Sequence, residues 1–596
     1  MRRLKYLNRY FLKYKRYLIP GIILTVISNF FAVYPAKIVG YALDLIVETL
    51  TVYRSVSGFS FQQDYYMFTI QVVAILAGLY LVLALVKGIF MFFMRQTLVV
   101  MSRHIEYDLK NDIYAHYQKL DQAFFKRNNT GDLMTRISED VSKVRMYVGP
   151  ALMYAVNLLV MFILVINGMV TVSPMLTLYV LLPMPVMAVM IYFINSQVLK
   201  QSSAVQKQLS SLSSLSQEVF SGVRVIKSYN RSAYFSGLFS KKSDEYKDSS
   251  LSLIKYDALF FPVILFLIGL STLITVYAGG IEVMAGRLNP GVIGEFIIYV
   301  NLLTWPVASV GWVSSMVQQA AASQERINEF LHTKPEIKND IHPIKSDIKG
   351  HIVFNNVSFT YPDTGIKALK DISFETFPGQ IVGITGRTGS GKSTIAAILG
   401  RLYDTDSGNI TIDGIDIQKM DLWHLRRSIG YVPQEIILFS DTIAENISFG
   451  THKQTTAEDW ENAARQAGVY QNIIEFREKF ETKIGERGVK LSGGQKQRIS
   501  IARALINDPP ILLFDDCLSA VDAETEENIL LHIMDVSKGK TTFLISHKVS
   551  TLKKCDQILV LENGSLVDRG THQQLLHSGG YYARIAKLQS EPEEEV

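Results

Sequence analysis

Five stretches of this chain contain no Asp, Glu, Lys or Arg: 17–36, 65–86, 146–199, 258–281 and 296–324. Each reaches at least the roughly 20 residues that an α-helix needs to cross the apolar core of a bilayer. The third stretch is more than twice that length. Its middle holds residues typical of a tight turn between two helices, namely Asn167, Gly168, Ser173 and Pro174. The pattern therefore predicts six membrane-spanning helices, near 17–46, 65–99, 146–167, 174–195, 256–281 and 291–320.

Two segments between these stretches, 100–147 and 196–255, are too polar to stay in lipid, yet they keep apolar residues at helical spacing. We expect them to extend membrane helices two to five beyond the bilayer. Each extension contains a glycine with polar neighbours, in FFKRNNTGDLMTRISEDV (124–141) and in SGVRVIKSYNR (221–231). Such breaks predict a short transverse helix at the tip of each helix pair, and an ordinary solvated loop is the alternative.

Charge outside the apolar stretches predicts the topology. The segment MRRLKYLNRYFLKYKR carries seven basic residues and no acid, whereas the hairpins 49–64, 170–174 and 282–289 are sparsely charged. The positive-inside rule then puts the N-terminus in the cytoplasm, and six spans return the C-terminus there. We expect a multi-pass protein of the cell (inner) membrane. The start is unlike a cleaved signal peptide, because its apolar stretch is too long and no small-residue cleavage site follows.

The amphipathic stretch 4–17 predicts a helix in the membrane interface, with Tyr, Phe and Leu facing inward and Arg and Lys among lipid head groups. The composition, 48% hydrophobic and 19% charged, agrees with a large membrane part. The net charge of +5 follows from the topology, so it does not indicate a nucleic-acid partner and we expect none. Cys517 and Cys555 lie in the cytoplasmic part, where we expect reduced thiols and no metal site.

The pattern changes after a polar linker at 325–350. Short β-branched runs alternate there with amphipathic helices over 351–590: HIVFNNVSF, QIVGITG, NITIDG, ILLFDD, TTFLISH and QILVLENG. This alternation predicts a mostly parallel sheet flanked by helices. An acidic tail, EPEEEV, follows at 591–596.

The motif GRTGSGKST follows the strand QIVGIT and opens an apolar helix. Its glycines allow a loop whose backbone N–H groups face one anion, and the positive helix end adds attraction. We expect Lys392 to bridge the outer phosphates of a nucleotide and the Ser393 hydroxyl to ligate Mg²⁺. The predicted nucleotide-binding residues of this loop are Gly386, Arg387, Thr388, Gly389, Ser390, Gly391, Lys392, Ser393 and Thr394.

Two further motifs follow. The run PILLFDD predicts a buried strand that delivers Asp515 to the sheet edge beside the phosphate loop, where it can hold Mg²⁺ through water. Between the loop and this strand, LSGGQKQR places paired glycines before a helix that contains Arg498 and Arg503. Ser492 can cap this helix, so its N-terminus is a candidate second anion site.

These three motifs, in this order, resemble the signature of ATP-binding cassette (ABC) proteins. The six-span part resembles the exporter branch of that family, in which one polypeptide carries one membrane half and one cassette. The resemblance covers essentially the whole chain. It implies an all-α, six-helix ABC exporter transmembrane domain over 1–324, followed by an α/β P-loop NTPase (ABC cassette) domain over 351–590. It also implies an ATPase, with ATP and Mg²⁺ as cofactors, that is coupled to transmembrane movement of substances.

The resemblance gives roles to residues in further matching motifs. Tyr361 in FTYPD sits where the family stacks an aromatic ring on adenine. Gln434 in YVPQE matches a glutamine that touches magnesium, and His547 in LISHK matches a histidine that contacts the terminal phosphate. The implied catalytic residues are Lys392, Gln434, Asp516 and His547, and the implied metal ligands are Ser393, Gln434 and Asp515.

The resemblance also implies a second chain. In the family two cassettes face each other head to tail, and each ATP lies between the phosphate loop of one and the signature of the other. The signature here is Leu491, Ser492, Gly493, Gly494 and Gln495. Glu486 in GERG matches a segment that contacts the transverse helices, and Asp522 in SAVD matches a loop at the dimer interface. The turns 124–141 and 221–231 resemble the coupling helices that dock onto cassettes.

Position 516 departs from the family pattern, which has glutamate where this chain has Asp516. A general base must lie within about 2.6–3.2 Å of the proton that it abstracts. Aspartate falls short by about 1 Å, a misplacement that costs on the order of 100-fold in rate. The chain therefore either pairs with a different half-transporter and carries the slow site, or forms a homodimer that uses aspartate through a small backbone shift or an intervening water. We favour the first, although His547 supports the second.

The substrate is less well defined by the sequence. Charges near or within the spans are candidates for function, with snorkelling at helix ends as the plainer interpretation: Lys37, Asp44, Lys87, Arg95, Asp257 and Glu295. We expect a lipid-like, amphipathic or drug-like substrate that is moved across the lipid bilayer. An ATP-gated channel or regulatory membrane protein with slow hydrolysis is the alternative from another class.

Overall fold

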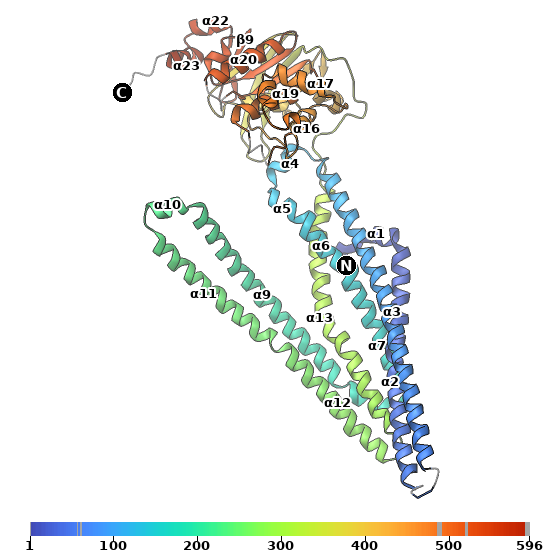
Figure 1. Ribbon diagram of the computed structural model, residues 1–596. Coiled ribbons are helices and arrows are strands. Elements are labelled where there is room, and N and C mark those ends of the chain that lie inside the picture. The colour runs from blue at the N-terminus through green and yellow to red at the C-terminus, as the bar shows by residue number, and fades with distance from the viewer. Residues whose placement is uncertain (1, 56–57, 60–61, 486–490, 519–522, 591–596) are drawn as a thin grey trace. The chain divides into compact units, whose positions relative to one another are not determined.

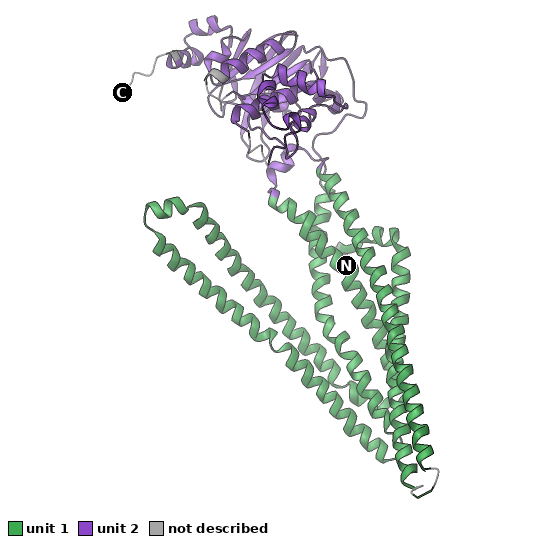
Figure 2. Ribbon diagram, viewed as in Figure 1, with its two compact units in different colours: residues 1–117, 131–333 green, residues 118–130, 334–596 purple. Residues whose placement is uncertain are grey.

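The structure, a computed structural model, describes residues 2–55, 58–59, 62–485, 491–518 and 523–590. It divides into two compact units, coloured green and purple in Figure 2. Unit 1 comprises residues 1–117 and 131–333, and unit 2 comprises residues 118–130 and 334–596. A short segment from the membrane part of the sequence, 118–130, therefore packs with the nucleotide-binding part.

Unit 1 is helical, as the apolar pattern predicts. Within the described residues, six helices are long and apolar enough to cross a membrane. They are Lys15–Ser55 (α2), Gln62–Tyr117 (α3), Thr130–Val172 (ending in α7, Leu152–Val172), Pro174–Ser221 (α8, Pro174–Leu181, and α9, Pro183–Ser221), Ser232–Met284 (α11, Ser232–Asp257, and α12, Phe260–Met284) and Gly291–His332 (α13). The polar extensions expected between the spans continue these helices, as Figure 1 shows for α9 and α11.

The turn in the longest apolar stretch includes fewer residues than the sequence predicted, and it lies later in the chain. Asn167 and Gly168 lie inside α7, and the chain turns only at Ser173. The Ser173 hydroxyl accepts a hydrogen bond from the Leu176 N–H at 3.3 Å, and Pro174 begins α8. A capping serine followed by proline at the first helical position is sufficient to start the new helix.

Helices α2 and α13 approach closely where glycines face each other. A Cβ added at Gly291 would lie 1.9 Å from the Gly40 carbonyl oxygen. The Gly291 N–H donates to Asp44 Oδ1 at 2.5 Å, and the buried Glu295 accepts from the Tyr299 hydroxyl at 2.7 Å. Asp44 and Glu295 thus form hydrogen bonds with other residues of unit 1. The plainer expectation from the sequence was that such charged side chains snorkel toward the membrane surface.

The N-terminal segment forms η1 (Arg2–Leu7), which contacts α13, and α1 (Asn8–Lys13), whose side chains bond to α3. Leu7 and Tyr10 are buried, as the amphipathic pattern predicts. Arg9 pairs with Asp112 at 2.5 Å and Lys13 pairs with Asp108 at 2.6 Å, so acids on α3 are partners of these basic side chains that the sequence did not predict.

The first transverse helix is α4, Gln122–Arg127. Asp121 caps it by accepting a hydrogen bond from the Phe124 N–H at 3.2 Å, and the helix ends at Asn128. The predicted range 124–141 is therefore wrong in its second half, because helix restarts at Thr130 and continues into the third span. The second transverse helix, α10 (Val223–Ser228), lies inside the predicted range 221–231 and joins α9 to α11 (Figure 1).

The linker also begins later than Glu325, the expected start. Helix α13 continues to His332 because Ile327 and Phe330 extend its buried face. The chain leaves helical geometry at Thr333, whose backbone is extended.

Within its described residues, unit 2 contains two sheets. A four-stranded antiparallel sheet has the order β2-β1-β4-β5, with strands Lys367–Thr376, Ile352–Thr360, Ser407–Ile412 and Ile415–Asp416. A six-stranded, mostly parallel sheet has the order β10-β9-β3-β8-β7-β6, with strands Ser565–Gly570, Gln557–Glu562, Ile381–Gly386, Thr541–Ile545, Ile511–Asp515 and Ile429–Val432. The sequence predicts the parallel core, but it does not separate the antiparallel sheet as a second layer.

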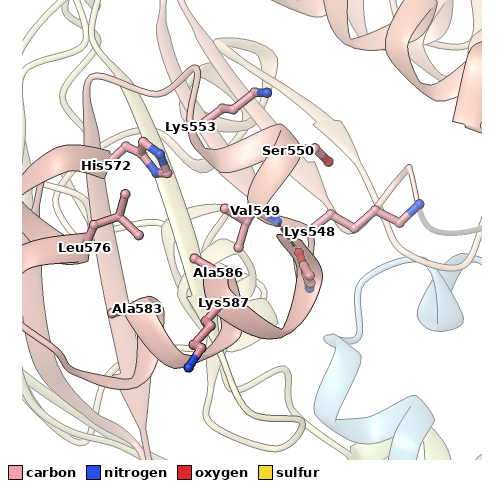
Figure 3. Close-up of a pocket in the computed structure, with 10 residues that line it drawn as sticks. Lys548, Val549, Ser550, Lys553, His572, Leu576, Ala583, Ala586 and Lys587 are labelled. Atoms are coloured by element: carbon pink, nitrogen blue, oxygen red, sulfur yellow. Dashed lines mark hydrogen bonds between the residues drawn. The ribbon is translucent and has the colours of Figure 1, made fainter. Parts of the chain in front are cut away.

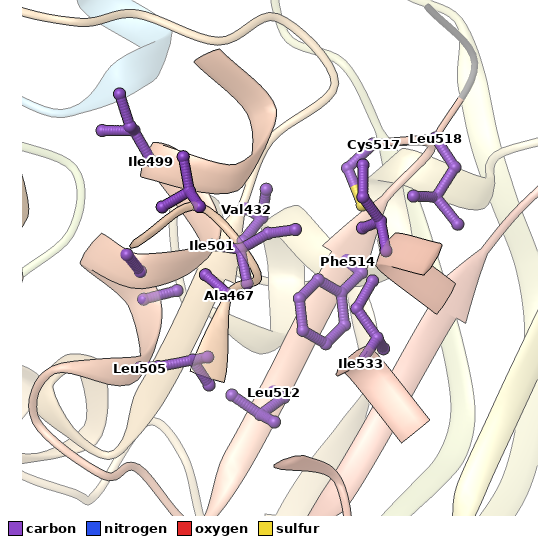
Figure 4. Close-up of a cluster of buried hydrophobic side chains, with 14 of the residues drawn as sticks. Val432, Ala467, Ile499, Ile501, Leu505, Leu512, Phe514, Cys517, Leu518 and Ile533 are labelled. Carbon is purple, nitrogen blue, oxygen red and sulfur yellow. The ribbon is translucent and has the colours of Figure 1, made fainter. Parts of the chain in front are cut away.

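Helices cover these sheets: α14 (Lys392–Leu399), α15 (Leu422–Arg427), α16 (Ile443–Ser448), α17 (Ala457–Gln466), α18 (Tyr470–Ile474), α19 (Gly493–Leu505), α20 (Ala523–Val536), α21 (Val549–Leu552), α22 (His572–His577) and α23 (Tyr581–Ser590). One hydrophobic core joins β7 to α19 and α20. Figure 4 shows Phe514 of β7 with Ile501 and Leu505 of α19 and Ile533 of α20, and all four are buried. This packing ties the helix that follows the signature motif to the strand that ends in Asp515.

We predict that Gly291→Ala destabilises unit 1, because the new methyl group would overlap the α2 backbone. Overpacking of this kind costs about 1–3 kcal/mol. Thermal unfolding of the detergent-solubilised chain should show a lower Tm. Gly280→Ala in α12, where an added Cβ meets no atom within 4 Å, is the matched control and should unfold at the wild-type temperature. Equal Tm values for the two variants would contradict the close approach of α2 and α13.

Candidate functional site

The phosphate loop connects the end of β3 to the start of α14. Gly391 has a φ of +98°, in the left-handed region, and a Cβ there would lie 2.4 Å from the Ala368 carbonyl oxygen. Only glycine fits this position without strain. The glycines of the motif thus shape a tight loop that ends at the N-terminus of α14, where backbone N–H groups can bind an anion.

Lys392 lies within this loop rather than in solvent. Its side chain is 7% exposed, and Nζ donates to the carbonyl oxygens of Gly386 and Arg387 at 3.0 Å each. Burial lowers the pKa of the ammonium, and the carboxylates of Asp516 and Asp515 oppose that shift. A cation held at this depth can reach the outer phosphates of a nucleotide bound by the loop.

The acidic residue expected to hold Mg²⁺ lies at the carboxyl end of β7, beside the phosphate loop. β7 ends at the buried Asp515, whose Oδ1 accepts a hydrogen bond from Ser393 Oγ at 2.9 Å. Burial raises the pKa of the Asp515 carboxyl. The Ser393 hydroxyl and the Asp515 carboxylate are hard oxygen ligands of the kind that Mg²⁺ prefers. Substrate phosphates and water would supply the remaining ligands.

Asp516 has an unusual backbone. Its φ is +45°, and its N–H donates to the Ile545 carbonyl oxygen at 3.0 Å. Gln434 Nε2 donates to its Oδ2 at 3.4 Å. Burial raises the pKa of this carboxyl, while His547 and Lys392 act in the opposite direction. A carboxylate with a raised pKa beside the phosphate loop is suited to accept a proton.

His547 follows β8 and faces the same space. Burial and the nearby Lys392 cation lower the pKa of its imidazole, and Asp516 opposes this shift. The neutral ring can accept or donate one hydrogen bond, as required for contact with a phosphate oxygen or a bound water.

A cavity of about 330 Å³ unites most of the predicted site residues. Its lining includes Tyr361, Thr388, Gly389, Gly391, Lys392, Ser393, Thr394, Gln434, Asp515, Asp516 and His547. Gly386, Arg387 and Ser390 belong to the loop but do not line the cavity. These predicted residues thus form one site, drawn from the carboxyl ends of four parallel strands, β3, β6, β7 and β8, and from Tyr361 after β1.

The expected adenine platform, Tyr361, closes one side of this cavity. Its hydroxyl and the Thr394 hydroxyl share a hydrogen bond of 3.0 Å. Lys126 of α4 lies 4.8 Å from the centre of the Tyr361 ring, and Ala123 of the same helix is buried in the core of unit 2. Sequence reasoning identified α4 as a docking element but gave no role to Lys126, since nothing in a local pattern shows which ring a lysine meets.

The signature lies apart from this cavity. Ser492 caps α19 through a capping box: its hydroxyl accepts from the Gln495 N–H at 3.3 Å, and Gln495 Oε1 accepts from the Ser492 N–H at 3.0 Å. Leu491 is buried, and Gly493 and Gly494 form the first turn. None of these five residues lines the phosphate-loop cavity. Glu486 and Asp522 lie outside the described residues.

The two arginines of the signature helix, Arg498 and Arg503, have partners elsewhere in unit 2. Arg498 donates to the Gly468 carbonyl oxygen at 2.8 Å. Arg503 donates to the backbone and side-chain oxygens of Asn446 at 2.7 Å each. Both therefore fasten α19 to neighbouring loops, and the capped helix end alone remains as the candidate anion site.

Sequence reasoning missed Gln589 on α23. Its Oε1 accepts from the Val549 N–H at 2.8 Å, and its Nε2 donates to the His547 carbonyl oxygen at 3.0 Å. The side chain thus bonds to the backbone on both sides of Lys548, and it lines the pocket whose Lys548 and Val549 are labelled in Figure 3. No local motif marks a glutamine so far along the chain, so only the fold reveals this contact.

Comparison with known families agrees with this geometry. The family model of the ABC transporter transmembrane region matches residues 18–307, and that of the ABC transporter matches residues 369–519. The chain resembles a solved bacterial Atm1-family ABC exporter with ATP bound, at a TM-score of 0.77 and 25% identity, over 97% of this chain and 99% of that one.

Curated relatives cover the chain from end to end. It is 35% identical to the probable multidrug resistance ABC transporter ATP-binding/permease protein YheI of Bacillus subtilis, over 97% of this chain and 96% of the relative. It is 33% identical to the multidrug resistance-like ATP-binding protein MdlA of Escherichia coli, over 99% and 97%. It is 34% identical to the ATP-dependent lipid A-core flippase of Pseudomonas fluorescens, over 92% and 90%.

These matches explain why six apolar helices precede a phosphate-loop domain in one polypeptide. The chain belongs to the ABC transporter family, as a membrane-embedded, ATPase-driven half-transporter of the exporter type.

Proposed function

We propose that this chain forms one half of a dimeric exporter, in which its Asp516 site hydrolyses ATP slowly and its signature completes the site of a second, different half-transporter. The observation that carries the proposal is that the phosphate loop and the signature motif of this chain lie apart. Lys392 and Asp515 line one cavity, whereas Ser492 and Gly493 do not. A signature with an intact helix cap therefore needs a nucleotide from another chain.

Helix α10, at the tip of the pair α9 and α11, gives a second reason to propose a dimer. Helix α10 buries none of its residues. Large apolar side chains at this tip are strongly exposed, with Phe220 at 76%, Val225 at 61% and Tyr229 at 75%. Exposed apolar patches of this kind are typical of protein contact sites. The cassette of a partner chain is the proposed acceptor.

The setting of Asp516 favours the slow-site interpretation. A homodimer with two efficient sites would need the carboxylate to advance toward the water by a backbone shift or through a second water. The Asp516 N–H is already bonded to the Ile545 carbonyl oxygen, and its left-handed backbone leaves little freedom for a residue other than glycine. Gln434 holds the carboxylate as well. His547, which still lines the cavity, is the feature that favours the homodimer.

ATP is the proposed ligand of the phosphate loop, with Tyr361 against the adenine and Lys392 at the outer phosphates. Ser393, Gln434 and Asp515 would hold Mg²⁺, which neutralises charge on the phosphates when it is bound. Asp516 would accept the proton of the attacking water, and His547 would contact the terminal phosphate. Binding requires only the loop and the lysine, so a short carboxylate at position 516 impairs hydrolysis more than affinity.

The proposed cargo is a lipid-like, amphipathic or drug-like molecule. Relatives are named for multidrug resistance and for lipid A-core flipping, which supports this class. We further propose that both termini and the nucleotide site face the cytoplasm, on the strength of the seven basic residues that precede the first span. Nucleotide then biases a two-state equilibrium between inward-facing and outward-facing forms.

We predict that Asp516→Glu raises the ATPase rate of the purified chain, because the longer side chain brings the base to the water. The expected gain is up to about 100-fold in kcat, with little change in KM. Steady-state ATP hydrolysis by the full-length wild type and the variant measures it. Lys392→Ala should be inactive in both backgrounds and serves as the control for contaminating ATPases.

The same purification tests whether the second chain is a different half-transporter. Co-purification of a different half-transporter, with fast hydrolysis only in the mixed assembly, supports the proposal. Robust turnover by the isolated wild-type chain as a homodimer, unimproved by Asp516→Glu, contradicts it.

We predict that Gln589→Ala lowers kcat for ATP by up to about tenfold and leaves KM unchanged, because two hydrogen bonds that hold the backbone around His547 are lost. Gln573→Ala on α22, an exposed glutamine away from that backbone, is the matched control. If Gln589→Ala behaves like Gln573→Ala, α23 does not position the histidine.

A further inference from the structure

A surface pocket of about 810 Å³ lies in unit 2, between α21, α22 and α23. Its lining includes Lys548, Lys553 and Lys587, and the described residues that line it include no Asp or Glu. Figure 3 shows these three lysines around the edge of the pocket, with Val549 and Ala586 between them. The pocket therefore presents positive charge around small apolar side chains.

The lysines differ in how their charge is balanced. Lys548 donates to the Glu526 carboxylate, which neutralises it. Lys553 is exposed and has no ion pair within the described part of the chain. A surface concavity whose charges have one sign attracts ligands of the opposite sign. The lining of this pocket therefore favours an anionic occupant.

The chain itself carries an anionic segment at this place. Helix α23 ends at Ser590, and the next six residues, EPEEEV, contain four glutamates and no basic residue. This segment, 591–596, lies outside the described residues. Lys587 and Gln589, in the last turn of α23, line the pocket, so the segment begins at its edge. Six residues extend up to about 20 Å. A ligand tethered so closely has an effective concentration in the millimolar range, so weak ion pairs are sufficient to hold it.

Helix α23 also contacts the nucleotide site at two points. Tyr581, its first residue, packs against Arg387 of the phosphate loop, with 5.8 Å between the guanidinium carbon and the centre of the ring. Near its other end, Gln589 donates to the His547 carbonyl oxygen at 3.0 Å. Whatever holds α23 in place therefore also positions the phosphate loop and His547.

We propose that the acidic segment 591–596 binds in this pocket of its own chain, with its glutamates paired to Lys553 and Lys587. The bound segment holds α23 against α21, and through α23 it keeps His547 in position for ATP hydrolysis. The inference concerns the cassette itself and does not depend on which half-transporter is the partner. The acidic segment is thus a regulatory element, whose release by salt or by charge reversal slows hydrolysis.

Carbodiimide cross-linking of the full-length wild type, which joins a carboxylate to an amine in direct contact, tests the docking. Mass spectrometry identifies the joined peptides. We expect the segment to be joined to Lys553 at least about fivefold more than to Lys419, an exposed lysine that follows β5. About 0.5 M NaCl should reduce the yield, because it screens surface charges. No preference for Lys553, or a cross-link that joins the segment to another polypeptide, overturns the proposal.

A charge swap tests the effect on the nucleotide site. Lys553→Glu repels the acidic segment, so kcat for ATP should fall about threefold with KM unchanged, the effect of two or three surface ion pairs. Adding Glu593→Lys and Glu594→Lys to that variant restores the attraction and should recover the rate. Lys419→Glu is the matched control and should hydrolyse ATP as the wild type does.

The rescue separates docking from a purely structural role of Lys553, because a folding defect at that position would persist in the triple variant. Failure of the triple variant to recover the rate, or a wild-type rate for Lys553→Glu alone, overturns the regulatory role. The cross-linking of the wild type needs no variant and therefore tests the docking even if a substituted chain fails to fold.

Discussion

The parallel pairing of β3, β8 and β7 is the constraint on which the nucleotide site depends. Ile384 pairs with Ile545, and Ile545 pairs with Asp515 across the same sheet. Because parallel strands end at one edge, this register brings three loops together that are far apart in sequence. The phosphate loop follows β3, the two acids end β7, and His547 follows β8. A slip of one residue in β7 would turn Asp515 away from Ser393.

The same sheet separates the signature from the phosphate-loop cavity within unit 2. Helix α19 packs on the sheet through Ile501 and Phe514, so its position is fixed by the core. Gly493 and Gly494, in the first turn of this helix, do not line the cavity that holds Lys392. This separation is what the proposed dimer accounts for, since a second cassette would bring its own signature to the phosphate loop. The proposed dimer is thus a consequence of core packing as much as of the motifs.

Periodicity and motif order could predict a large part of this molecule. The membrane spans can be predicted from the charge-free runs. The phosphate loop, Gly386–Thr394, and the separate positions Gln434, Asp515, Asp516 and His547 can be predicted from short sequence motifs. The features that the sequence does not predict depend on tertiary contacts. Arg9 and Lys13 pair with acids on α3, Arg503 bonds to Asn446, and the antiparallel β1–β2 sheet arises from pairing that alternation alone does not specify. Gln589 belongs to no motif, since its significance lies in the backbone groups that its side chain contacts.

The central claim is that nucleotide held by the phosphate loop drives a change in the side of the membrane to which the cargo site opens. ATP-dependent accumulation of a fluorescent amphipathic dye in inside-out vesicles that contain this chain and its natural partner measures that claim most directly. The account predicts that Lys392→Ala abolishes uphill accumulation while the protein remains folded and inserted. Undiminished accumulation by this variant, or strictly downhill movement by the wild type, would contradict it.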